Sequence, residues 1–202
     1  MSKRRKKLLI MLIGLGLFLL FVIGVLIFDM LGENDPDDFE KLPEFDFYTP
    51  DYDINILQDP EYTELNRLVS YKNGAVTVTV APEEYPATDP VLAFIAELTD
   101  TMIGGRYSEY PSFFSESYIL ENELPESFTM QRIYDITVER IGEEQGSSGE
   151  NLLIYMLDYK ISKNDGTLRR DIGSDSSKPW YLAIVSENGE YKIDNILTYS
   201  EK

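Results

Sequence analysis

The 202-residue chain contains no cysteine and no histidine. Without cysteine it can form no disulfide, no thiolate zinc site and no cysteine nucleophile. Without histidine it lacks the imidazole base of a Ser-His-Asp triad. Basic residues are also scarce, with 18 against 36 acidic residues and a net charge of −18. Nucleic-acid binding depends on Lys and Arg to displace phosphate counterions, so we expect no nucleic-acid partner.

The longest apolar run lies near the N-terminus. Five consecutive basic residues at 3–7 precede 21 uncharged residues at 8–28. As a helix, these residues span roughly 30 Å, the thickness of one hydrocarbon core. The alternative, a cleaved signal peptide, usually has an apolar region of about 7–15 residues and small residues at its cleavage site, which Ile27-Phe28-Asp29-Met30 does not provide. We predict a basic tail at residues 1–7 and a transmembrane helix at 8–28.

The charge on either side of this helix predicts its orientation. All 36 acidic but only 13 basic residues follow it, so the positive-inside rule places the N-terminus in the cytoplasm and residues 29–202 outside. None of the nine asparagines lies in an N-glycosylation acceptor, and no cysteine is present. Both absences fit a bacterial envelope, so we expect a single-pass protein of a bacterial cell membrane.

Residues 29–89 have the composition of a stalk. Residues 29–64 carry 13 acidic residues and one basic residue, and seven of the ten prolines lie between Pro36 and Pro90. Proline removes backbone donors and like charges repel, which predicts an extended segment over 29–59. Aromatic residues are unusual in a spacer, so this segment could instead dock on the folded domain or on a partner. They are Phe39, Phe45, Phe47, Tyr48 and Tyr52.

A hairpin is predicted within this stalk at residues 67–80. Asn73-Gly74 is typical of a tight turn, and Val76, Val78 and Val80 alternate with threonine. Because two strands alone are barely stable in water, we expect the hairpin to lean on the following domain.

Residues 90–202 predict one α+β domain that begins with a helix. Asp89-Pro90 is a typical helix start, and Gly104-Gly105 ends the helix. Short helices are expected at Pro111 and Pro125. Apolar and threonine side chains at helical spacing mark one face of the first helix: Leu92, Ile95, Ala96, Thr99, Met102 and Ile103.

From residue 133 the apolar period changes to two, which indicates strands. Five segments then follow in an antiparallel meander: 133–141, 152–163, 168–172, 180–185 and 191–199. The basic pair Arg169-Arg170 falls on the third segment, where cross-strand salt bridges with the surplus acids are expected.

The order of these elements resembles the nuclear-transport-factor-2-like family, whose cone-shaped fold is shared with ketosteroid isomerases. The residues that carry the resemblance are 90–103, 107–114, Tyr134-Asp135-Ile136, 153–161, 180–185 and 191–196. It implies an antiparallel sheet curved around a cavity beneath the long helix, where many members bind or isomerise small apolar molecules. Phe94, Tyr155, Tyr159 and Trp180 are the expected lining of such a pocket.

No catalytic residue can be assigned in that cavity. A carboxylate base with a tyrosine donor could move a proton beside a carbonyl. However, alternation places Asp158 on the face opposite Tyr155 and Tyr159, so no carboxylate is expected beside them. We likewise expect no metal and no cofactor.

Two functions therefore remain open. The layout of tail, membrane helix, stalk and cone looks like the assembly subunits of conjugation and type IV secretion channels, which act through protein contacts. This predicts a non-catalytic interaction module in the envelope, with a filled or closed cone and an exposed apolar patch. The alternative is an open cone that holds a small apolar ligand, as a binding protein or an isomerase-type enzyme.

Overall fold

The computed structural model describes residues 45–146 and 149–197. The predicted tail and transmembrane helix, and the first part of the predicted stalk, lie outside the described residues. Among the helices that are described, none has the length and apolarity needed to cross a membrane. Phe45–Lys202 form one compact unit.

Six strands and four α-helices build this unit, which is α+β as predicted. The strands are β1 (Val69–Asn73), β2 (Val76–Val80), β3 (Ile133–Gln145), β4 (Asn151–Ile161), β5 (Trp180–Glu187) and β6 (Glu190–Leu197). The α-helices are α2 (Pro60–Thr63), α3 (Tyr85–Thr88), α4 (Pro90–Ile103) and α5 (Glu116–Glu121). The 3-10 helices are η1 (Ile56–Gln58), η2 (Pro82–Glu84) and η3 (Tyr110–Phe113).

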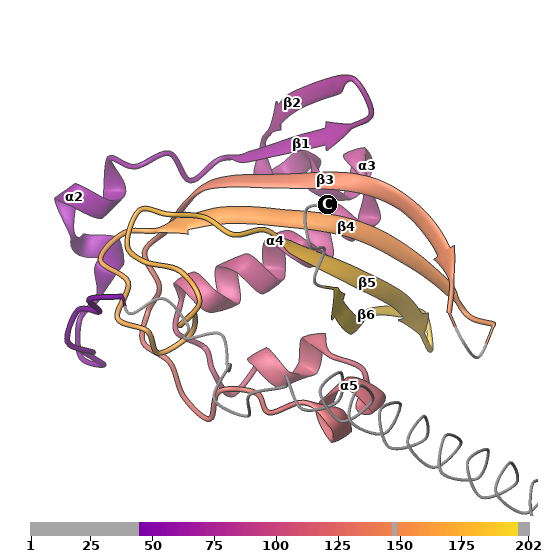
Figure 1. The fold of residues 1–202 in the computed structure, drawn as a ribbon. Helices are drawn as coiled ribbons and strands as arrows, with labels where there is room; N and C mark the ends of the chain where they lie inside the picture. The colour runs from indigo at the N-terminus through magenta and orange to yellow at the C-terminus, as the bar shows by residue number, and fades with distance from the viewer. Residues whose placement is uncertain (1–44, 147–148, 198–202) are drawn as a thin grey trace, which may run out of the picture. The chain divides into compact units, whose positions relative to one another are not determined.

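The strands form one curved sheet in the order β2-β1-β3-β4-β5-β6, which arches over α4 (Figure 1). All neighbours are antiparallel except β1 and β3, which run parallel. Strands β3–β6 form the antiparallel meander predicted from residue 133 onward, without a strand at 168–172. The whole sheet is not purely antiparallel, because a crossover that includes α4 returns the chain beside β1. A register shift between Tyr134 and Thr137, with Asp135 at φ +51°, adds to the curvature of β3.

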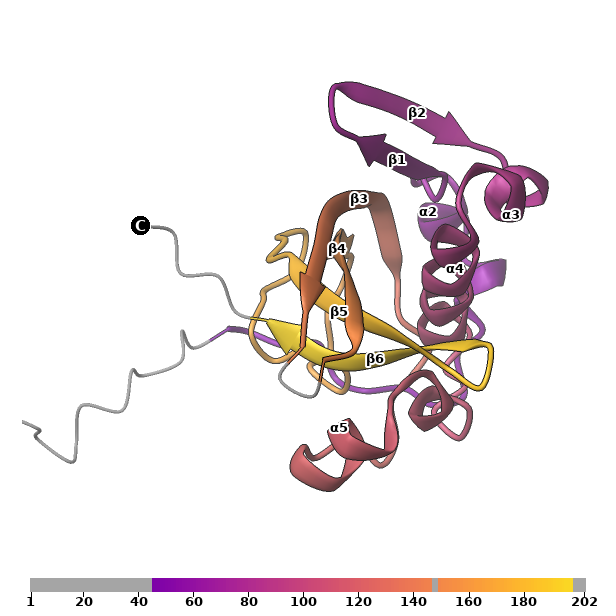
Figure 2. The same ribbon diagram turned by 90° about the vertical axis from the view of Figure 1, so that its right-hand side faces the viewer.

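Helix α4 lies against the concave side of the sheet (Figures 1 and 2). Its start is set by Asp89, whose Oδ1 accepts a hydrogen bond of 2.9 Å from the Val91 N–H. Its end is followed by Gly105 at φ +63°, a conformation that favours glycine. All six side chains predicted on its inner face are buried, and Val91, Leu98 and Thr101 are buried as well.

Residues 45–89 differ from the predicted stalk because they pack on the domain. The Phe45 and Phe47 rings lie so close to Gly173 and Gly166 that a Cβ on either glycine would be 3.0 Å from the ring. The Tyr48 N–H donates a hydrogen bond of 2.9 Å to the Asn164 carbonyl. These contacts hold an acidic, proline-rich segment against the loop between β4 and β5.

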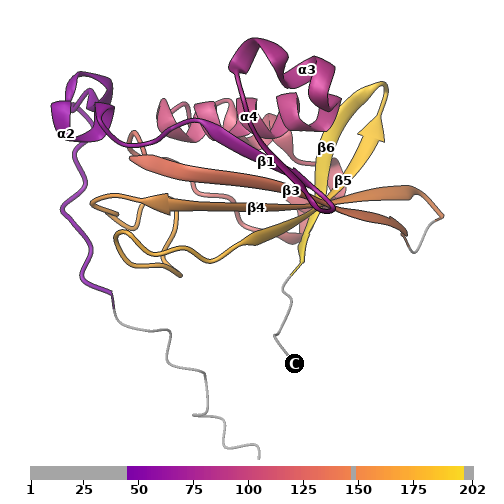
Figure 3. The same ribbon diagram turned by 90° about the horizontal axis from the view of Figure 1, so that it is seen from above.

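The same segment contributes to the hydrophobic core. Ile56 in η1 and Tyr62 in α2 are buried, and the Tyr62 hydroxyl donates to the Ile133 carbonyl at 2.9 Å. Strands β1 and β2 match the predicted hairpin and extend the sheet, because β1 pairs with β3, which lies beside it in Figure 3. The folded unit therefore begins well before the predicted boundary at residue 90.

Ile56→Ala tests whether this segment is part of the core. We expect it to lower the free energy of unfolding by about 2–5 kcal/mol, because it leaves a cavity in the core. Leu57→Ala is the matched control, since Leu57 is exposed and its loss should cost less than about 0.5 kcal/mol. Urea unfolding of the full chain measures both. Equal, small effects would mean that residues 45–89 are a spacer.

Two predicted elements are absent from the described residues. Residues 168–172 lie in the loop between β4 and β5 and form no strand. The Nδ2 of the buried Asn164 donates hydrogen bonds to the carbonyl oxygens of Arg169 and Ile172, at 3.0 and 2.8 Å. In a strand these carbonyls would instead accept hydrogen bonds from a neighbouring strand. The helix expected at Pro125 is likewise missing. The helix expected at Pro111 is present as η3.

Candidate functional site

The four residues predicted to line a cone pocket lie in different surroundings. Phe94 on α4 packs against Phe113 and Tyr191, with ring centroids 5.6 and 6.1 Å away, beside a surface pocket. Tyr159 meets Trp180 edge to face at 5.8 Å. Tyr155 is buried, and its hydroxyl donates a hydrogen bond to Asp89. The structure thus brings Tyr159 and Trp180 together and places the other two residues elsewhere.

Asp89 is the centre of a buried hydrogen-bond network beneath the sheet. The side chain is only 7% exposed, and its Oδ2 accepts hydrogen bonds from Tyr71 at 2.6 Å and Tyr155 at 2.7 Å. Its Oδ1 caps α4 through Val91. One carboxylate therefore connects β1, β4 and the first turn of α4.

The two tyrosines of this network are held in the neutral state. Burial and the hydrogen bond to Asp89 raise the pKa of Tyr71 to about 12, and the same two causes raise the pKa of Tyr155 further. Because both hydroxyls donate to Asp89, neither proton is directed toward a substrate. The chemistry of this cluster is that of a structural connection between helix and sheet.

Arg169 forms a second buried cluster, in the loop between β4 and β5. The side chain is 3% exposed, and the guanidinium lies 4.5 Å from the Trp180 ring centroid and 5.5 Å from that of Tyr159. It donates to both carboxylate oxygens of Asp171, at 2.6 and 2.9 Å, and to the Lys178 carbonyl at 3.1 Å. A further bond of 3.3 Å reaches the Tyr159 hydroxyl.

This arrangement corrects the prediction of cross-strand salt bridges for Arg169 and Arg170. Arg169 pairs with Asp171 two residues along the same loop, and Arg170 lies exposed with a bond of 3.2 Å to the Gly166 carbonyl. Burial alone would raise the pKa of Asp171, but the Arg169 guanidinium outweighs it and holds that pKa below its usual value. Arg169 is therefore a clamp that fixes the loop onto β4 and β5.

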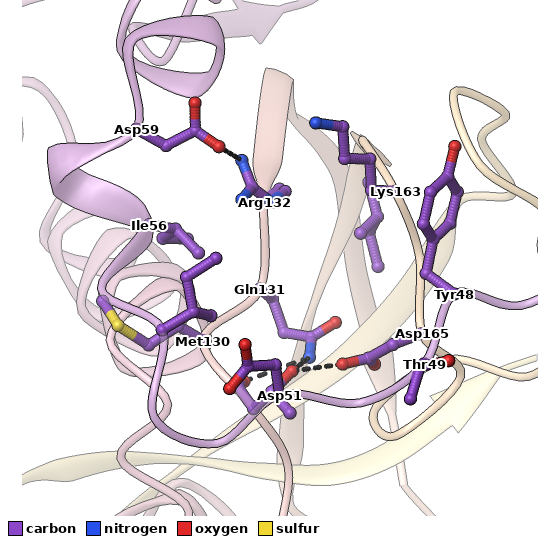
Figure 4. A pocket seen from close by; sticks show the side chains of 13 residues that line it. Tyr48, Thr49, Asp51, Ile56, Asp59, Met130, Gln131, Arg132, Lys163 and Asp165 are labelled. Atoms are coloured by element: carbon purple, nitrogen blue, oxygen red, sulfur yellow. Dashed lines mark hydrogen bonds and ion pairs between the residues drawn. The ribbon is translucent and has the colours of Figure 1, made fainter.

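A pocket of about 410 Å³ lies between the docked segment 48–59 and the residues that precede β3 and follow β4 (Figure 4). Its described lining combines charged, polar and apolar side chains: Tyr48, Thr49, Asp51, Ile54, Ile56, Asp59, Thr129, Met130, Gln131, Arg132, Ile161, Lys163 and Asp165. Figure 4 shows the Asp59–Arg132 ion pair, at 2.6 Å, toward one end and the Gln131 amide toward the other.

Most charges around this pocket are already paired. Besides the Asp59–Arg132 pair, Lys163 contacts Glu61 at 2.5 Å. The Thr129 hydroxyl donates to Asp165 at 2.5 Å. The hydrogen bond to Arg132 holds the pKa of Asp59 below its usual value. These contacts join the segment 48–59 and its neighbours to the sheet. The charged side chains in the pocket walls are therefore mainly engaged in ion pairs and hydrogen bonds that hold the fold together.

The Gln131 amide leaves one acceptor unused. Its Nε2 donates to the Thr129 carbonyl at 3.1 Å, which fixes the amide orientation because a carbonyl only accepts. Its Oε1 is buried without a hydrogen-bond partner among the described residues. In the part of the chain that the structure describes, no three His, Cys, Asp or Glu side chains lie close enough to hold a metal ion.

Sequence reasoning missed the partners of Asp89 and the burial of Arg169. Asp89 was identifiable as a helix cap, but its carboxylate reaches Tyr155 from outside the sheet, where strand alternation gives no information. A signal for Arg169 was present in the only tryptophan of the chain, eleven residues later, since Arg and Trp stack favourably. Comparison with known proteins found no matching family model, no matching curated protein and no matching solved structure.

Proposed function

We propose that this chain is a non-catalytic interaction module, held outside a bacterial cell membrane by its N-terminal helix, that serves as a scaffold or assembly subunit of an envelope complex. One observation carries the proposal. The tyrosines Tyr155 and Tyr159, expected to line an open pocket, are each only 1% exposed, and their hydroxyls are engaged by Asp89 and Arg169. A filled interior leaves the outer surface to make functional contacts.

A nuclear-transport-factor-2-like cone is the fold we propose for this unit. It is supported by the long helix that precedes β3–β6 and by the curvature of the sheet around that helix (Figure 2). The hairpin of β1 and β2 is then an addition to one edge of the cone.

The alternative, binding of a small apolar molecule inside the cone, is less well supported. It requires Phe94, Tyr155, Tyr159 and Trp180 to face one cavity, and Phe94 instead packs with Phe113 and Tyr191. The Tyr155 hydroxyl already donates its hydrogen bond to Asp89, so it has no proton left to donate to a ligand.

Site-directed labelling tests the location on which the proposal depends. The chain has no cysteine, so single-cysteine variants give no background. Leu120→Cys lies on α5 at a highly exposed position, and Ser2→Cys lies in the predicted cytoplasmic tail. A membrane-impermeant maleimide should label the full-length Leu120→Cys variant in intact bacteria and Ser2→Cys only after permeabilisation. Protection of Leu120→Cys in intact cells would contradict the proposal.

A further inference from the structure

The two edges of the sheet differ in how they are covered. The edge strand β6 is covered by the chain around η3 and α5: Phe114 bridges to Ile193, and the Ser115 N–H donates to the Ile193 carbonyl at 2.9 Å. The hydroxyls of Ser115 and Ser117 both donate to Asp194 at 2.8 Å. At the opposite edge, no described element lies beyond β2 (Figure 2).

Strand β2 also lacks the features that normally protect an edge. Natural edge strands carry lysine, proline or a bulge that blocks further pairing. In β2 the sequence is Val-Thr-Val-Thr-Val, its pairing with β1 is regular, and its first four residues are exposed. Val76 is 63% exposed and Val78 is 43% exposed. Residues 73–81 carry no charge in a chain with a net charge of −18, so like-charge repulsion between chains is weakest here.

The hydrogen-bonding groups of β2 alternate between β1 and the free edge. Asn73 pairs with Val76 around the two-residue loop Gly74-Ala75, and Gly74 has φ +60°. In such a turn the carbonyl of Asn73 accepts from the Val76 N–H, so the backbone groups of Val76, Val78 and Val80 face β1. The N–H and carbonyl groups of Thr77 and Thr79 therefore face outward.

The sequence of β2 is the same in both directions, which suits pairing with itself. In an antiparallel pair centred on Val78, Val76 lies opposite Val80 of the second copy, and Thr77 lies opposite Thr79. The outward-facing threonines then exchange backbone hydrogen bonds with each other, as the antiparallel pattern requires. Two-fold symmetry demands a surface of this self-complementary kind.

We infer that β2 pairs antiparallel with β2 of a second copy of this chain, which continues the sheet across a dimer. Lys72 on β1 is already paired with Glu139 of β3 at 2.8 Å, so the self-complementary sequence and the missing charge of β2 carry this inference. The chain's own segment 29–44 is a poor occupant, because it has no uncharged run of five residues to match β2.

Cysteine crosslinking of the full-length chain in its membrane tests both the partner and the register. Val78→Cys should form a disulfide-linked dimer on mild oxidation. Val78 meets its own copy in a non-hydrogen-bonded pair, where Cα atoms are about 4.5 Å apart and within disulfide range. Thr77→Cys alone should crosslink poorly, because the two Thr77 positions lie diagonally across the paired strands, and this spacing of about 7–8 Å is too long for a disulfide. Thr77→Cys and Thr79→Cys expressed together should crosslink to each other.

Leu120→Cys, on the exposed surface of α5, is the control for random collision. We expect the Val78→Cys dimer to predominate and the Leu120→Cys dimer to remain at background. Equal crosslinking of the two variants, or a Val78→Cys chain that stays monomeric, would overturn the inference. A Val78→Cys disulfide to a different protein would also overturn it and would identify another strand as the occupant.

Discussion

Asp89→Ala is expected to lower the free energy of unfolding by about 3–4 kcal/mol. The change removes a helix cap, which typically contributes about 1 kcal/mol, and two hydrogen bonds from buried hydroxyls to a carboxylate. It also leaves the hydroxyls of Tyr71 and Tyr155 buried without their acceptor. Small domains are stable by only about 5–15 kcal/mol, so this loss should be visible as a clear shift of the urea midpoint.

Conservative variants separate the parts of this network. Asp89→Asn keeps an oxygen for the Val91 N–H and should lose less than Asp89→Ala. Tyr71→Phe and Tyr155→Phe each remove one hydroxyl and should cost about 1–3 kcal/mol. If Asp89→Ala changed the stability by no more than an exposed surface substitution, about 0.5 kcal/mol, then Asp89 would not join the helix to the sheet as described.

Arg169→Ala is expected to have an effect of similar size, about 3–5 kcal/mol, because it leaves Asp171 partly buried without its cation and opens space beside Trp180. Arg169→Lys should recover only part of the loss, since an ammonium cannot bind both oxygens of Asp171 while lying over the ring. Urea unfolding measures both variants.

The single tryptophan provides a local readout of this clamp. Trp180 is the only tryptophan in the chain, so its emission reports directly on the ring beneath the guanidinium. We expect Arg169→Ala to shift the native emission, whereas the control Arg170→Ala, at an exposed neighbour, should leave emission and stability nearly unchanged. Unchanged emission in Arg169→Ala would mean that the guanidinium does not lie over Trp180 in solution.

Local patterns predicted several elements of this fold well. Asp89-Pro90 and Gly104-Gly105 mark the ends of α4 at the observed residues, because capping depends on short-range backbone chemistry. Period-two alternation located β3, β4, β5 and β6, and the Asn-Gly signal located the hairpin of β1 and β2. The expectation that tyrosines of β4 face inward was also met at Tyr155 and Tyr159.

Long-range packing explains what the sequence did not predict. Acidic residues and prolines around residue 50 indicated a spacer, yet Ile56 is buried and the Phe45 and Phe47 rings pack against Gly173 and Gly166, which composition cannot reveal. The apolar residues of 168–172 resemble a short strand, but the Asn164 side chain takes the backbone carbonyls of that segment. Arg169 is buried because Asp171 and Trp180 neutralise and cover it, which depends on the folded loop.

Native mass spectrometry of the full-length protein, gently extracted from the membrane in which we propose that it is anchored, tests the central claim most directly. The claim is that the interior of this domain is filled by side chains and that the domain functions through protein contacts on its surface. It predicts complexes with stoichiometric protein partners, including a second copy of the chain, and no small molecule retained by the domain. A bare chain that carries a small retained mass would contradict the claim, because the interior would then be a binding pocket.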